Sequence, residues 1–289
     1  MNQITIYYKT KTKLIEEIEK YDYIKTLKEP SFLKKLTFSK QEYPDIYFHS
    51  GIVDAKAIDL IKNSKKVVVN SKAIEEEILL NTQISKENIS VIYPSIDIED
   101  KKIKEIKSKI CEELNIDKKN KIILFTAKNL KKSGIKEFIE IIYTLTSKDF
   151  QVIIAGDSTA INNLRFQISK YNTGNKLILI EDYSNMDDLF YISDIFILPT
   201  YNTTFAVNTL KAMYCKCAVF VSFDNHAKEL LDVFSMMESP SDSSTPFKVD
   251  ALLNSKSDLK LIKKQNRKIA KEHTLSKNLE KLNDIIHSI

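Results

Sequence analysis

Three nearly uninterrupted apolar runs constrain the fold of this chain more than any other feature. They read IILFTA at residues 122–127, VIIAG at residues 152–156 and IFILP at residues 195–199. A strand with one exposed face alternates apolar and polar residues, whereas a strand covered on both faces does not alternate. Because helices cover both faces of a parallel sheet, these runs predict a buried parallel sheet.

Short β-rich runs alternate with longer helical patterns along almost the whole chain. Apolar residues at helical spacing mark segments such as 73–81, 134–145 and 186–191. The predicted strands are Ile4–Tyr8, Asp45–His49, Lys66–Asn70, Ile89–Tyr93, Lys121–Thr126, Gln151–Ala155, Leu177–Ile180, Asp194–Leu198 and Cys217–Ser222. This alternation predicts an α/β fold with doubly wound parallel sheets.

The alternation is interrupted once, between Pro94 and Asn120. This segment holds a proline, a charged helical stretch and a lysine-rich turn, which together are typical of a domain boundary. The sequence therefore predicts a first domain over residues 1–97, a linker with a helix over residues 98–120 and a second domain over residues 121–289. The charged helical segment 252–289 either folds back across the boundary or extends into solvent.

Composition argues against several classes of protein. The net charge of +5 arises from 44 basic and 39 acidic residues spread along the chain, so nucleic-acid binding is not implied. No apolar run approaches the roughly 20 residues that span a bilayer, which leaves only peripheral contact with an anionic membrane surface open. The start of the chain lacks a signal-peptide core, and the three cysteines lack metal-ligand spacing. We expect a reduced, cytoplasmic protein without a metal.

Three segments carry motifs in a recognisable order. They read KVVVNSKAIEEEI with ISVIYPSID, then IILFTAKNLKKSGIKEFIEII with FQVIIAGD, and finally MDDLFYISDIFILPTYNTTFAVNTLKAMYCKCAVFVS. Together they resemble the family-4 retaining glycosyltransferases. The resemblance implies a GT-B-like fold, with two Rossmann-like doubly wound parallel-sheet domains of which the N-terminal one is reduced. It also implies a nucleotide-sugar site in the C-terminal domain.

The resemblance implies that the loop after the strand IILFT contacts the diphosphate of the nucleotide sugar. The family has Gly-Arg-x-x-x-x-Lys-Gly in this loop, whereas this chain has an alanine, Lys128, Ser133 and Gly134 at the four defined positions. Lys128 can meet a phosphate oxygen as a point charge, without the two-pronged fork of arginine. Lys131 and Lys132 lie close enough to replace the missing lysine. The alternative is that the three lysines form a solvated turn.

Both glutamates of the family's donor loop are replaced. The family has Glu-Gly-Phe-Gly before a helix and a second glutamate eight positions after the first, but this chain has Thr203, Thr204, Phe205 and Ala206, with Lys211 at the second position. The resemblance implies contact of the first glutamate with the transferred sugar and of the second with the ribose. Thr203 keeps a hydrogen-bonding group without the charge, and Lys211 reverses the charge. Thr204, in place of a glycine, leaves less space for the helix N-terminus to approach the phosphate.

Four further positions are candidates for the site. Tyr201 and Asn202 precede the donor loop, where they can contact a ligand or, for Asn202, form a turn. Glu229 resembles a family position near the donor, with a first-turn glutamate favoured by the helix dipole as the alternative. His49 ends a predicted strand, where a histidine can assist an acceptor hydroxyl as a catalytic group. The alternative for His49 is a satisfied structural histidine.

Two hypotheses for the function remain open. Two more positions of the family motif differ in this chain, in addition to those in the donor loop. Lys216 stands where the family has a glycine, and Ala218 stands where it has a proline. The first hypothesis is a glycosyltransferase that moves a sugar from a UDP- or GDP-linked donor to a glycan, lipid or protein acceptor without another cofactor. The second is a catalytically inactive scaffold that binds a partner glycosyltransferase, an acceptor protein or another assembly. No catalytic triad, metal cluster, Walker motif or Rossmann glycine motif supports another enzyme class.

Overall fold

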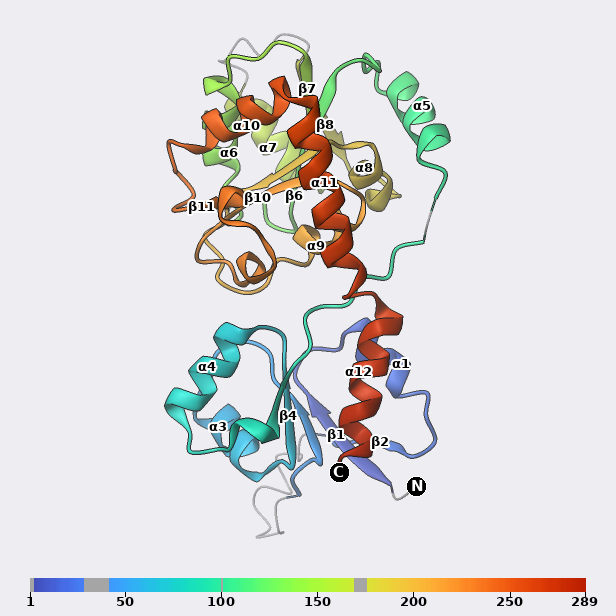
Figure 1. The fold of residues 1–289 in the computed structure, drawn as a ribbon, viewed down its shortest axis with the longest axis vertical. Helices are drawn as coiled ribbons and strands as arrows, with labels where there is room; N and C mark the ends of the chain where they lie inside the picture. The colour runs from blue at the N-terminus through green and yellow to red at the C-terminus, as the bar shows by residue number, and fades with distance from the viewer. Residues whose placement is uncertain (1–2, 29–41, 100, 169–175) are drawn as a thin grey trace. The chain divides into compact units, whose positions relative to one another are not determined.

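The structure, a computed structural model, consists of two α/β units. It describes residues 3–28, 42–99, 101–168 and 176–289. The first unit is Met1–Asp97 with His273–Ile289, and the second is Ile98–Glu272. Each unit contains one parallel sheet with helices packed on it (Figure 1). The predicted α/β fold with buried parallel sheets is therefore confirmed.

The sheet of the first unit has the strand order β2-β1-β3-β4-β5, and all its pairings are parallel. Its strands are β1 Ile4–Tyr8, β2 Ile24–Thr26, β3 Ile46–Phe48, β4 Lys66–Val69 and β5 Ile89–Val91. Its helices are α1 Lys13–Ile18, α3 Ala55–Asn63, α4 Lys72–Asn81 and α12 Leu275–His287. This is the flavodoxin-like order, in which the direction of winding reverses between β1 and β3.

Both faces of the first sheet are buried. Successive strand residues point to opposite faces, so Ile46 packs with α1 and α12 while Tyr47 packs with α3 and α4. Asp54 and Ser71 begin α3 and α4, and their side chains accept hydrogen bonds from first-turn N–H groups. These caps fix where each helix starts relative to the strand before it.

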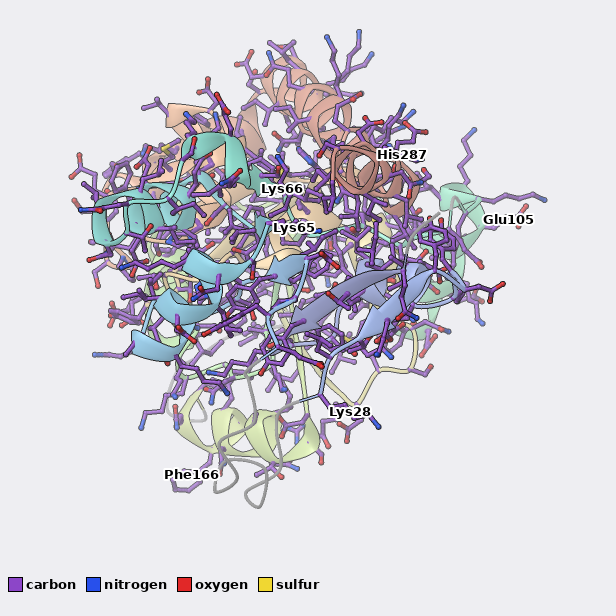
Figure 2. All side chains as sticks on the ribbon, turned by 90° about the horizontal axis from the view of Figure 1, so that it is seen from below. Lys28, Lys65, Lys66, Glu105, Phe166 and His287 are labelled. Carbon is purple, nitrogen blue, oxygen red and sulfur yellow. The ribbon has the colours of Figure 1, made fainter. Side chains whose placement is uncertain are left out.

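The amino end of the first sheet is held by charged side chains. The Lys65 ammonium lies 2.8 Å from the Asp45 carboxylate, which also accepts bonds of 2.7 Å from the Thr5 N–H and hydroxyl. Lys66 donates to the Glu87 carbonyl at 2.9 Å. Lys65 and Lys66 lie next to each other at the start of β4 (Figure 2). Polar groups thus close the end of the sheet opposite to that on which His49 lies.

The sheet of the second unit has the strand order β11-β10-β9-β6-β7-β8, again with parallel pairings. Its strands are β6 Lys121–Thr126, β7 Phe150–Gly156, β8 Leu177–Glu181, β9 Ile195–Leu198, β10 Ala218–Ser222 and β11 Met236–Met237. Its helices are α5 Ile103–Glu113, α6 Ile135–Thr144, α7 Ser158–Ile168, α8 Met186–Ile192, α9 Val207–Tyr214, α10 Thr245–Asn254 and α11 Lys256–Lys271. From the β8 edge this is the 3-2-1-4-5-6 order of dinucleotide-binding sheets, and it reverses between β6 and β9.

The division of the chain differs in two places from the domains predicted from sequence. The segment 98–120, treated as a linker, lies in the second unit, where α5 packs against α8. His273–Ile289 lies in the first unit rather than the second. The reason is apolar burial, because Leu282 and Ile286 of α12 join the core cluster that contains Leu14 of α1.

Candidate functional site

The carboxyl ends of β6 and β9 mark the point where the strand order of the second sheet reverses. In open parallel sheets ligands bind in the crevice at such a point, because the connections on either side diverge. Loop 127–134 follows β6, loop 199–206 follows β9, and loop 223–230 follows β10, the next strand in the sheet. All three loops contain residues that the sequence analysis selected.

The loops after β6 and β9 lie in direct contact. The Tyr201 N–H donates to the Lys132 carbonyl at 3.4 Å, and the Tyr201 hydroxyl donates to Glu137 Oε1 at 2.7 Å in the first turn of α6. Gly134 adopts a φ of +80°, and a Cβ built on it would stand 1.8 Å from the Pro199 carbonyl oxygen. Only glycine permits both this backbone conformation and this approach.

Three lysines give the loop after β6 a positive charge. Lys128, Lys131 and Lys132 are exposed, and within the described part of the chain none of them forms an ion pair. Gly134 is the N-cap of α6, so no side chain caps that helix. Ser133, in contrast, is only 6% exposed, so its contact with a ligand stays a prediction. Three uncompensated cations beside a helix N-terminus form a suitable environment for a diphosphate.

The donor loop exposes its polar residues and buries its aromatic one. Asn202, Thr203 and Thr204 are exposed, whereas Phe205 is 7% exposed. The apolar ring of Phe205 anchors the loop immediately before α9 begins. Two threonine hydroxyls are therefore free to meet a ligand on the solvent side of the loop.

Asn225 holds the donor loop in place, although it was not among the site residues predicted from the sequence. This residue is fully buried. Its Nδ2 donates to the carbonyls of Asn202 at 2.8 Å and Thr204 at 2.7 Å, while its Oδ1 accepts from the N–H groups of Ala206 at 3.1 Å and Ala227 at 3.0 Å. The only signal in the sequence is an asparagine shortly after a strand, where this residue type favours turns.

We expect Asn225→Ala to lower the free energy of unfolding by about 2 kcal/mol, because it leaves buried backbone groups without partners. The donor loop should also exchange its amide hydrogens faster. Urea unfolding and hydrogen exchange of peptides covering residues 199–210 measure the two effects. Asn208→Ala is the matched control, since among the described residues Asn208 makes a single side-chain bond, to the Thr126 carbonyl at 3.2 Å. Equal losses in the two variants would contradict the role given to Asn225.

Lys211 is compensated within the second unit. Its Nζ lies 2.7 Å from Asp187 Oδ1 on α8, and the two side chains are 30% and 32% exposed. The charge that replaces the family's second glutamate therefore forms an ion pair between α8 and α9. Lys216, at the family's glycine position after α9, has a φ of +63°, the left-handed conformation in which a helix commonly ends on glycine.

Glu229 lies after β10, two strands along the sheet from β6 and from the loop with Lys128, Lys131 and Lys132, here called the lysine loop. It belongs to the 3-10 helix His226–Leu230, is half-buried, and lines a pocket formed with α11. Its contact with the donor, expected from the resemblance, stays a prediction.

His49 lies at the corresponding point of the first sheet, directly after β3, where the strand order reverses between β1 and β3. It is 4% exposed, and its Nδ1 lies 3.1 Å from the Tyr47 hydroxyl. Burial lowers the pKa of the imidazole, which keeps the ring neutral at pH 7. The ring lines a pocket of about 60 Å³ whose wall also includes Lys9 and Ser50. These lining residues were not selected from the sequence.

Residues 3–28, 42–99, 101–168 and 176–289 include neither a metal-ligand cluster nor a helix that could span a membrane. There, no group of three or more His, Cys, Asp or Glu side chains could hold a metal ion. Over the same residues no helix combines the length and apolar character needed to cross a bilayer.

The second unit contains the whole of a match to a known protein family. Residues 106–269, more than half of the chain, match the family described as Glycosyl transferases group 1. The chain belongs to this family. As a group 1 glycosyltransferase it has the GT-B fold that its sequence predicts. The lysine loop, the donor loop and Glu229 all fall inside the matched residues.

One curated protein and two solved structures are among those similar to this chain, and the two structures share its fold. A Campylobacter jejuni protein named N,N'-diacetylbacillosaminyl-diphospho-undecaprenol alpha-1,3-N-acetylgalactosaminyltransferase is 33% identical over 145 residues, which cover 47% of this chain and 37% of that protein. The structure of Anabaena Alr3699/HepE in complex with UDP superposes with a TM-score of 0.72 at 15% identity, covering 84% of this chain and 72% of the other. A glycosyltransferase structure from Rickettsia africae gives a TM-score of 0.72 at 17% identity, covering 99% of this chain and 98% of the other. The chain thus spans little more than a third of its curated relative.

Proposed function

We propose that this group 1 glycosyltransferase moves a sugar from a nucleoside diphosphate donor to a hydroxyl of a glycan, lipid or protein acceptor. The observation that carries the proposal is the exposed lysine loop at the carboxyl end of β6. Lys128, Lys131 and Lys132 lie there without carboxylate partners in the described chain, beside the start of α6. A nucleotide sugar needs such cations because its leaving diphosphate gains negative charge as the bond to the sugar breaks.

The reaction we propose keeps the anomeric configuration, as in the family-4 enzymes that the sequence resembles. Thr203 offers a hydroxyl to the transferred sugar where those enzymes have a glutamate. Neither Thr203 nor Lys211 supplies a carboxylate, and Lys211 is already paired with Asp187. The transition state is then stabilised through the charge of the leaving diphosphate. Lys128 and its two neighbours supply that stabilisation.

The similar proteins suggest which donor and which acceptor to test first. The Anabaena structure contains UDP, which makes UDP-sugars our first choice of donor. The name of the Campylobacter relative describes a sugar-bearing diphospho-undecaprenol, so a lipid-linked saccharide is our first choice of acceptor. His49 is the side chain of the first unit that we propose for the acceptor hydroxyl, since its neutral imidazole can accept a proton.

Calorimetric titration with UDP, GDP and their common sugar conjugates tests the donor site. We expect one nucleotide to bind with micromolar affinity, and Lys128→Ala to weaken that binding about tenfold by removing one charge-assisted contact. Lys119→Ala is the matched control, because Lys119 is an exposed lysine in the turn before β6, at the amino end of that strand. It should bind the nucleotide like the unaltered protein.

Two results would overturn the proposal. One is the absence of binding to every nucleotide up to millimolar concentration. The other is equal weakening by Lys128→Ala and Lys119→Ala, which would show that net charge rather than the loop attracts the nucleotide. If one nucleotide binds as expected, its sugar conjugates are then tested for transfer to lipid-linked saccharides.

A further inference from the structure

Helix α11 presents a continuous stripe of lysines to solvent. Its exposed lysines follow one another at spacings of four, four, four and three residues, which places them on one face of the helix. They are Lys256, Lys260, Lys264, Lys268 and Lys271. The helix runs along the surface of the second unit, where it packs against α9, α10 and β10 (Figure 1).

The other cations of α11 have structural roles, and the lysine stripe does not. Lys263 pairs with the buried Asp194 at 2.6 Å, and the Arg267 guanidinium donates to the Tyr214 carbonyl while stacking on the Tyr214 ring. In the described residues, by contrast, no carboxylate pairs with a lysine of the stripe. The stripe therefore carries uncompensated charge along the length of the helix.

A pocket lined by both apolar and polar side chains borders this stripe. It has a volume of about 680 Å³, and its apolar walls are Leu230, Leu231 and Phe234 after β10, with Ile262 and Ile269 from α11. Lys268 belongs both to the stripe and to the lining of the pocket, so the charged and apolar surfaces are continuous.

Exposed apolar side chains extend the pocket toward solvent. Leu261, which precedes Ile262, is 55% exposed, and Val233, which precedes Phe234, is 78% exposed. Glu229 and Asp232 are the acidic residues of the lining, so the pocket itself does not suit a phosphate group. The cations of the stripe therefore suit phosphate groups better than the pocket does.

We propose that the stripe, the pocket and these two exposed residues form a docking surface for an anionic phospholipid bilayer. The lysines would contact phosphate headgroups, with their hydrocarbon stems lying along the apolar surface. Leu261 and Val233 would enter the interfacial region, and the pocket would receive an acyl chain. A nucleic acid would use the cations but would leave the apolar part of the surface unoccupied. The proposal does not rest on the transfer activity.

Flotation of the 289-residue chain with lipid vesicles tests this surface. We expect strong binding when about a third of the lipid is phosphatidylglycerol and little binding to phosphatidylcholine alone. Binding should weaken as the ionic strength rises from about 0.1 M to about 0.5 M, because salt screens exposed charges.

The triple variant Lys260→Gln, Lys264→Gln, Lys268→Gln should bind the anionic vesicles on the order of 100-fold more weakly. The matched control changes Lys104, Lys109 and Lys119 to glutamine, which removes the same charge from exposed positions elsewhere in the second unit. Binding of this control variant to the anionic vesicles should weaken by less than about threefold. Leu261→Gln should weaken binding about fivefold without changing the net charge. Circular dichroism shows whether each variant is folded.

Three outcomes would overturn the proposal. The first is equal binding to anionic and neutral vesicles by the unaltered protein. The second is an equal loss in the stripe variant and the matched control, which would reduce the effect to net charge. The third is binding to heparin or DNA as tight as to vesicles, with no effect of Leu261→Gln, which would assign the stripe to a polyanion instead.

Discussion

Replacing Gly134 with alanine is expected to destabilise the second unit by about 3 kcal/mol or more. Gly134 has a φ of +80°, where a side chain alone costs about 1–2 kcal/mol. The added Cβ would also stand 1.8 Å from the Pro199 carbonyl oxygen and 2.7 Å from its carbon. These are backbone atoms, so the loop after β9 must shift to relieve the overlap. Urea unfolding followed by circular dichroism, with hydrogen exchange of β6 and β9, measures the effect.

The chain contains a matched control for this substitution. Gly51 has a φ of +96°, yet nothing lies within 4 Å of a Cβ built on it. Gly51→Ala should therefore cost only the backbone strain, about 1–2 kcal/mol. A loss for Gly134→Ala no larger than that for Gly51→Ala would show that the loops after β6 and β9 do not depend on their close contact.

The contact between Gly134 and Pro199 also has a consequence for nucleotide binding. It sets the distance between the lysine loop and the donor loop, which together form the proposed donor site. A folded Gly134→Ala protein should bind UDP more weakly than the unaltered protein, although no lysine has been removed.

The strands were predictable because their signal is local. Buried runs such as Lys121–Thr126 are apolar on both faces, and the structure forms β6 over the same residues. Two short strands were missed, β2 Ile24–Thr26 and β11 Met236–Met237. They hold three and two residues, too few to show any period, and they form because an existing strand offers its edge.

The position of the C-terminal helix was not predictable for a different reason. The sequence of α12 shows an apolar stripe, but a stripe does not identify the surface that will cover it. The structure covers Leu282 and Ile286 with the core of the first unit. The backbone bonds between Ile96 and the segment around Thr274, at 2.9 Å each, fix where the chain returns.

The candidate site was predictable where the resemblance supplied a motif. The lysine loop and the donor loop come from that source, and the structure places both at the carboxyl edge of the second sheet. The hydrogen bonds of Asn225 were not predictable, because they join residues up to 23 positions apart. They form only because the fold directs the Asn225 side chain toward the donor loop. The pairing of Lys211 with Asp187, across 24 positions, was missed for the same reason.

Replacing Asp194 with asparagine is expected to lower the free energy of unfolding by about 3 kcal/mol, because it leaves a partly buried lysine without its partner. Asp194 is 7% exposed, and its carboxylate lies 2.6 Å from Lys263 of α11 and 3.1 Å from the Ile122 N–H of β6. Asp187→Asn is the matched control, since that carboxylate forms an ion pair about a third exposed and should contribute less than about 1 kcal/mol.

The loss should also change how stability depends on pH. Burial raises the pKa of the Asp194 carboxyl, but the charges of Lys263 and Lys107 with the Ile122 N–H outweigh burial, so the net pKa is lowered. The unfolded chain then binds a proton more readily than the folded one, and stability rises with pH. This contribution is complete above the unfolded value of about 3.9 and is lost as the pH falls through the lower folded value. Urea unfolding between neutral and acid pH should show the difference between the unaltered protein and Asp194→Asn shrinking as the pH falls. A constant difference over that range would mean that packing, rather than charge, gives Asp194 its importance.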